Sequence, residues 1–141
     1  MEAWKTVVLA GLLLATVGCD QLSGQATASK AAVERFHDQL NNERYDAIIR
    51  GATAGFRIAA TPSERHAYFD GVRSSLGRHQ DSDRVAYSSD FGPSGSGVTV
   101  TLDSRFEFGS AQETFIFVER DDALVLHDYR INSQVFMMGR E

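Results

Sequence analysis

The spacing of apolar residues changes at Gly77, and this change constrains the fold more than any other feature of the sequence. Before Gly77, apolar residues recur at intervals of three and four, as on one face of an amphipathic helix. After it, the run from Val98 to Phe108 alternates with a period of two, with apolar side chains at 98, 100, 102, 106 and 108, as in a strand with one buried face. Because helices come first and strands follow, the pattern predicts an α+β domain.

The helical half predicts three helices. The second is short, at residues 45–50, and the third begins at residues 61–64, Thr-Pro-Ser-Glu. In that motif the threonine caps the helix, the proline suits the first turn, and the glutamate completes a capping box. Gly77 is expected to end this third helix. The first helix is expected to begin at Ser29 and to have one apolar face, formed by Val33, Phe36, His37 and Leu40.

Four strands are expected at residues 84–91, 98–108, 111–119 and 124–131. Gly109-Ser110 and Asp121-Asp122 are predicted as short turns, and strands joined by short turns pair in antiparallel fashion. The third strand is apolar on both faces at its centre, so we expect it to be central and covered on both sides. N-terminal helices packed on a curved antiparallel sheet of about four strands can bury a core at this chain length.

The N-terminal residues predict export and lipid attachment. Residues 6–18 carry no charge. This run is shorter than the roughly 20 residues of a membrane span but fits the apolar core of a secretory signal. Small residues then precede Cys19, the only cysteine. The pattern resembles the bacterial lipoprotein box, in which the cysteine is linked to diacylglycerol and the chain is cut before it. A lone cysteine in an ordinary cleavable signal, or in an uncleaved anchor, is the alternative.

The lipoprotein resemblance implies both a domain organisation and a location. Residues 1–18 would be the signal peptide, Cys19 the lipidation site and residues 19–28 a polar tether, followed by the domain at 29–133 and a tail at 134–141. The protein would then be anchored in the bacterial cell envelope, facing the periplasm. Two or three acyl chains hold a protein stably at a membrane. By resemblance to enteric lipoproteins, Asp20 after the cysteine favours the inner membrane.

Several function classes are excluded or disfavoured. The net charge of −5 argues against nucleic-acid binding, and a single cysteine cannot form an intrachain disulfide. Residues 92–97 do not form a nucleophile elbow, because Ser96 stands where the second glycine belongs. No two histidines have metal-ligand spacing, so no metal or cofactor is expected. His79 with Asp81 and Asp83 would form at most a weak cation site, and a solvated loop is the simpler interpretation.

The order of helices and strands resembles the cystatin-like and nuclear-transport-factor-two-like superfamily. More narrowly, the chain resembles small exported bacterial proteins with the domain of unknown function 4019, which has no assigned activity. This resemblance implies no catalytic residues. Folds of the superfamily often hold a pocket between the concave sheet face and the helices, which polar side chains such as tyrosines could line. The alternative is that the tyrosines of this chain are core residues with satisfied hydroxyls. The resemblance depends on residues 40–45, 73–77, 106–117 and 128–131, and the candidate pocket-lining residues are Tyr68, Tyr87, His127 and Tyr129.

These observations predict an envelope protein that is not an enzyme. The first hypothesis is a lipid-anchored module that binds a protein or peptide partner, for which the apolar residues 135–138 are a candidate contact surface. The alternatives are a pocket protein for a small apolar ligand and an isomerase-like enzyme. A concave, mostly apolar pocket larger than about 300 Å³ would favour the pocket protein. A desolvated carboxylate in an open polar cavity would favour the enzyme.

Overall fold

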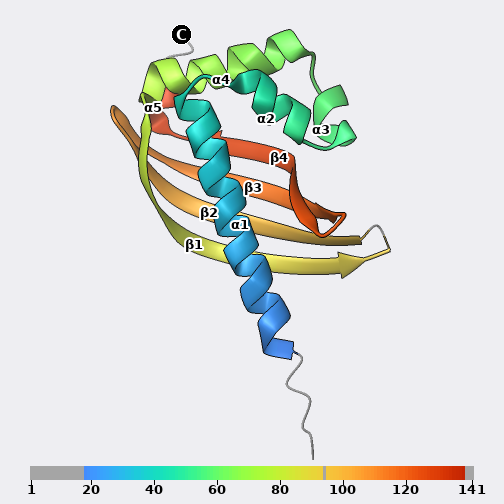
Figure 1. Cartoon of the computed structure of the whole chain (residues 1–141). Helices are drawn as coiled ribbons and strands as arrows, with labels where there is room; N and C mark the ends of the chain where they lie inside the picture. Colours follow the sequence, from blue (N-terminus) through green and yellow to red (C-terminus); the bar gives the residue numbers. More distant parts are fainter. Residues whose placement is uncertain (1–17, 94, 139–141) are drawn as a thin grey trace, which may run out of the picture.

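The computed structural model describes residues 18–93 and 95–138, and it confirms the α+β class. Helices precede a four-stranded antiparallel sheet, and the longest helix lies across one face of that sheet (Figure 1). The shorter helices gather near one end of the sheet. The helices are α1 (Gly18–Asn41), α2 (Tyr45–Gly51), α3 (Ala54–Ile58), α4 (Pro62–Leu76) and α5 (Gln134–Met138).

The sheet is a simple meander whose strands pair in chain order. Three register shifts interrupt the ladders, two between β1 and β2 and one between β3 and β4. Such irregularities bend a strand and increase its twist. The sheet therefore curves around α1 (Figure 1). The strands are β1 (His79–Gly92), β2 (Gly95–Phe106), β3 (Gly109–Arg120) and β4 (Ala123–Asn132).

The core fills the concave face of the sheet. Phe36 of α1 lies at the centre of an aromatic cluster, with its ring 5.0 Å from that of Phe115 and 6.0 Å from that of Phe69. Both contacts are edge-to-face, which is a favourable arrangement for aromatic rings. The alternation predicted for β2 is confirmed at the four apolar positions that are buried, Val98, Val100, Leu102 and Phe106.

The first helix begins earlier than the sequence predicts. Residues 20–28, expected as a tether, continue α1 without a break. No proline interrupts them, and Gln25 is half-buried with its amide 3.5 Å from the Glu119 carboxylate. At about 1.5 Å per residue, these nine residues add roughly 14 Å of helix, against about 30 Å for an extended tether. Residues 1–17, which include almost all of the expected signal peptide, lie outside the described part.

Within the described part of the chain, no helix is both long and apolar enough to cross a membrane.

One predicted turn is misplaced and another is confirmed. Phe106 pairs with Gly109, so the turn is Glu107-Phe108 and not Gly109-Ser110. Phe108 is consequently 65% exposed and does not join the core. Gly109 is the first residue of β3, and a Cβ there would lie 2.9 Å from the Val135 side chain. The Asp121-Asp122 turn is present, with φ of 50° and 61°, as the tight turn of a two-residue hairpin requires.

Three other features differ from expectation. β1 begins at His79, so the segment expected as a solvated loop is strand. The sequence does not predict α3 and α5, because five-residue helices are too short to show a helical repeat. Among the described elements, the helices cover only one face of the sheet (Figure 1). The opposite face of β3 is therefore half-buried, not covered, at Thr114, Ile116 and Val118.

The predicted start and end of α4 are both confirmed. Thr61 Oγ1 accepts from the Glu64 backbone N–H at 3.2 Å, and the Glu64 carboxylate accepts from the Thr61 N–H at 2.7 Å. The helix ends at Gly77, which has φ 78° and ψ −156°. Only glycine adopts this backbone region without strain. A Cβ there would also lie 2.7 Å from the Glu107 side chain.

Gly77→Ala is therefore expected to lower the free energy of unfolding by more than about 1 kcal/mol, through backbone strain and the clash with Glu107. Gly51→Ala is the matched control, because a Cβ there would meet no atom within 4 Å and the φ of this residue is ordinary. That variant should leave stability unchanged or raise it by up to about 1 kcal/mol. Denaturant unfolding measures the stability of the two variants. Equal effects of Gly77→Ala and Gly51→Ala would contradict the explanation.

Candidate functional site

An open groove lies between α1 and the strands β1 and β2, with a volume of about 870 Å³. Its apolar surface comes from Val33 of α1 and from Val100 and Leu102 of β2. The imidazoles of His37, from α1, and His79, from β1, also line it. Charged side chains of both signs stand along it, namely Lys30, Glu34, Asp81, Asp83 and Arg84. The groove thus combines an apolar surface, two imidazoles and a charged border.

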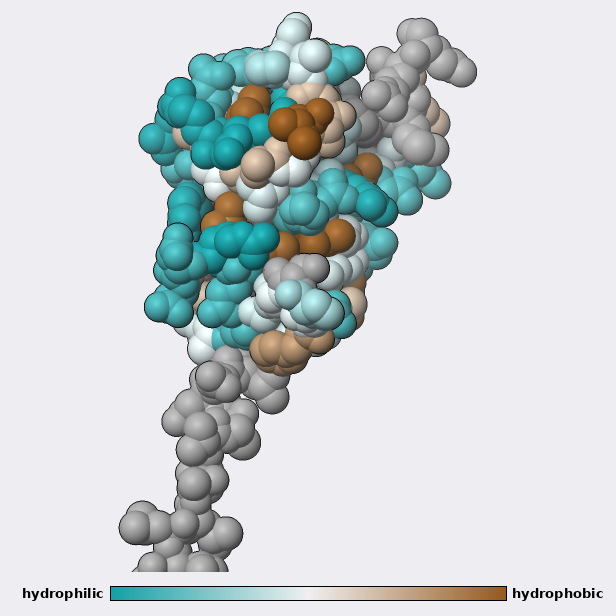
Figure 2. Space-filling model, turned by 90° about the vertical axis from the view of Figure 1, so that its right-hand side faces the viewer, coloured by the Kyte–Doolittle hydropathy of each residue, from teal (hydrophilic) through white to brown (hydrophobic). Residues whose placement is uncertain are grey.

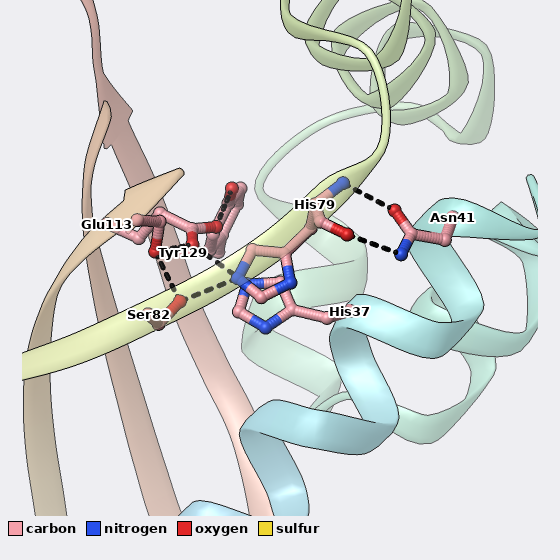
Figure 3. Close-up of polar contacts among 7 residues, drawn as sticks. His37, Asn41, His79, Ser82, Glu113 and Tyr129 are labelled. Carbon is pink, nitrogen blue, oxygen red and sulfur yellow. Dashed lines mark hydrogen bonds and ion pairs between the residues drawn. The ribbon is translucent and has the colours of Figure 1, made fainter. Parts of the chain in front are cut away.

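The carboxylate of Glu113 is buried beside this groove and is 0% exposed (Figure 3). Its Oε1 accepts from His37 Nε2 at 2.8 Å and from Ser104 Oγ at 2.6 Å. Its Oε2 accepts from the Tyr129 hydroxyl at 2.6 Å. Three donors from α1, β2 and β4 therefore meet one carboxylate on β3. A buried charge is tolerated when it is paired and hydrogen-bonded in this way.

Two serines extend the network from Glu113 to His79. Ser82 Oγ lies 2.7 Å from Ser104 Oγ, and His79 Nε2 lies 2.6 Å from Ser82 Oγ. A carboxylate can only accept, so the one proton of Ser104 points to Glu113. Ser82 must then donate to Ser104, and His79 must donate to Ser82. The hydrogen bonds thus assign the proton of the neutral His79 ring to Nε2.

The two histidines stack on each other. Their ring centroids are 3.5 Å apart and their planes differ by 5° (Figure 3). Asn41 fixes the backbone of His79 from α1, because its Oδ1 accepts from the His79 N–H at 2.7 Å and its Nδ2 donates to the His79 carbonyl at 3.1 Å. The C-terminal end of α1 is therefore joined to β1 by the asparagine and to β3 by His37.

Burial and charge set the ionisation of the network. Burial raises the pKa of Glu113, but the hydrogen bond and charge of His37, with the donors Ser104 and Tyr129, outweigh it, so that pKa is lowered. Burial beside the carboxylate raises the pKa of Tyr129, which remains a donor. Burial and the neighbouring His37 lower the pKa of His79 to about 4. Near neutral pH, the carboxylate is ionised and His79 is neutral.

The residues proposed from the sequence to line a pocket are not among those that line this groove. Tyr129 is buried in the core, where it serves the network through its hydroxyl. Tyr68 and Tyr87 are partly buried and pack against the core. His127 is exposed and contacts Thr53 Oγ1 at 3.0 Å through Nδ1. Cys19 lies in the first turn of α1, and its side chain is outside the described set.

Sequence reasoning misses most of the network. Glu113 and Ser104 occupy inward positions in strands whose other buried residues are apolar, and this interruption is the available signal. His37 does lie on the buried face of the first helix, as predicted. The meeting of His37, His79 and Glu113 depends on the pairing register of the sheet, and no sequence spacing reveals it. Their three ligand-type atoms all lie within 4.8 Å of one another, close enough to consider a metal ion.

Neither a protein-family model nor a curated protein matches the chain.

Glu113→Ala is expected to lower the free energy of unfolding by about 3–5 kcal/mol, because it leaves the donors of His37, Ser104 and Tyr129 buried without their acceptor. Glu34→Ala is the control, since its ion pair with Lys30 is exposed and contributes little. Replacing both Glu113 and His37 by leucine should recover much of the loss. Denaturant unfolding would contradict this account if Glu113→Ala were as mild as the control.

Proposed function

We propose that this protein is a lipid-anchored envelope protein that binds a small molecule in the groove between α1 and the strands β1 and β2, without catalysing a reaction. The observation that carries the proposal is the groove itself, which has about 870 Å³ beside a buried polar network. Ligand sites are typically concave, mostly apolar, and supplied with a few fixed polar groups. The ligand class is a small molecule with an apolar body and a hydrogen-bonding head.

The hydrogen bonding of Glu113 favours binding over catalysis. A general base must reach the proton that it removes. Both oxygens of Glu113 accept from donors within the protein, and its side chain is fully buried. The carboxylate therefore orients His37 and does not face a small organic molecule in the groove. The neutral ring of His79, half-buried in the groove wall, is the polar group best placed to meet a ligand.

The surface gives less support to a protein partner than to a small ligand. The exposed large apolar residues of the described part are spread over α3, β1, the turn between β2 and β3, and α5, at Ile58, Val85, Phe91, Phe108, Val135 and Met138. On the face drawn in Figure 2, apolar residues form small areas separated by hydrophilic ones. Protein interfaces are expected where apolar surface is extensive and continuous.

The arrangement of the fold supports a family proposal as well. Helices that pack on the concave face of a curved antiparallel meander are what the cystatin-like and nuclear-transport-factor-two-like resemblance implies. We therefore propose this superfamily for the chain, and the domain of unknown function 4019 as its narrower relative.

Filling the groove tests the binding proposal. Ala26 is a half-buried groove residue of α1, and Ala31 is an exposed residue of the same helix that does not line the groove. Fluorine NMR of the full chain in lipid nanodiscs, with a library of fluorinated fragments as probe, should detect binders with partly apolar bodies. Ala26→Trp should abolish their line broadening, and Ala31→Trp should preserve it. An absence of binders, or equal effects of the two variants, would refute groove binding.

Cys19→Ser tests the anchor. Because lipid attachment requires the thiol, the wild-type protein should be acylated at Cys19 and found in the membrane fraction, whereas the variant should be unacylated and released or misprocessed. Intact-mass spectrometry of membrane and soluble fractions measures both states. An unacylated wild-type protein that distributes like the variant would contradict lipidation.

A further inference from the structure

We propose that His37, His79 and Glu113 form a binding site for a divalent transition metal of the zinc type at the inner end of the groove. The ligands would be Nε2 of each histidine and Oε1 of the glutamate. One ring nitrogen of each histidine and one carboxylate oxygen of the glutamate lie within 4.8 Å of one another, and the three side chains come from α1, β1 and β3. This inference depends on the side-chain cluster and not on the organic ligand proposed above.

The donor set suits such a metal. Two imidazoles and one carboxylate with an open fourth position are a common zinc arrangement, with metal-ligand distances near 2.0–2.2 Å. Ligand atoms around a tetrahedral ion then lie about 3.3 Å apart. His37 Nε2 and Glu113 Oε1 are already 2.8 Å apart. A swing of the half-buried His79 ring out of its stack would bring the third atom into place (Figure 3).

Charge favours a cation at this position. The Glu113 carboxylate is fully buried, and its only ion-pair partner among the described residues is the His37 imidazole, which is charged only when protonated. A divalent ion would compensate the carboxylate more strongly than a proton on His37. The metal would replace the proton that each Nε2 donates in the hydrogen-bonded network, and each neutral imidazole would then carry its remaining proton on Nδ1.

Surrounding contacts would hold the ligands in position. Ser104 and Tyr129 hydrogen-bond to Glu113, and Asn41 fixes the backbone of His79. Such outer contacts orient metal ligands and tune their affinity. His37 and His79 line the groove, so an ion and a water ligand could enter from solvent.

Calorimetric titration of Zn²⁺ into the full chain in detergent, purified without a histidine tag, tests the site. The wild-type protein should bind one ion per chain. His79→Gln should weaken binding by more than about tenfold, because glutamine can still donate to Ser82 but is a poor metal ligand. Co²⁺ bound in place of Zn²⁺ should show the visible absorption of four-coordinate cobalt, and His79→Gln should abolish it.

Two controls separate this site from other histidines and from damage to the network. His127→Ala removes an exposed histidine, and Ser82→Ala breaks the hydrogen-bonded chain without removing a ligand, so both should bind Zn²⁺ like the wild-type protein. Absence of saturable binding, or equal affinities of the His79→Gln variant and the wild-type protein, would overturn the site. Because the titration and its variants report metal binding alone, its failure would leave the groove proposal standing.

Discussion

The arrangement of the molecule depends on the hydrogen bonds that the buried carboxylate of Glu113 accepts. It receives donors from α1, β2 and β4, so one charge on β3 joins four elements of the fold. An ionised group without these donors would cost several kcal/mol at this depth. The position of α1 is therefore tied to the sheet at His37, and Asn41 adds a second link to β1. The groove lies along the part of α1 that precedes these links.

Local patterns in the sequence predict the elements well wherever one local rule governs them. The capping box at Thr61, the end of α4 at Gly77 and the Asp121-Asp122 turn each depend on a few neighbouring residues, and all three are present. The hairpin after β2 shows the limit of such rules. A glycine-serine pair is a reasonable turn by composition, but Gly109 is needed for a close approach to Val135 of α5, which is a tertiary constraint.

Local sequence patterns do not predict the candidate site, because its residues are brought together by the pairing of the strands and the packing of α1 on the sheet. His37 and His79 are far apart in the chain, and they stack because α1 crosses the concave face opposite the start of β1. A strand is not predicted at His79, since its polar, charged sequence has no apolar alternation. Glu113 breaks the inward pattern of β3, and this departure marks the site. Departures from local consistency are expected to concentrate at functional positions.

Stability alone does not explain this network. Apolar residues of similar volume commonly replace a buried ion pair without loss of stability, so the polar groups would not be needed to hold α1 on the sheet. The network is not fully buried, as a purely structural one would be. It reaches the groove at His37 and His79, while Glu113 remains enclosed. Its buried end fixes the orientation of the imidazoles, and its open end presents them to whatever occupies the groove. A positioned pair of imidazoles that can hydrogen-bond to a ligand or bind a metal is a reason to retain the charge.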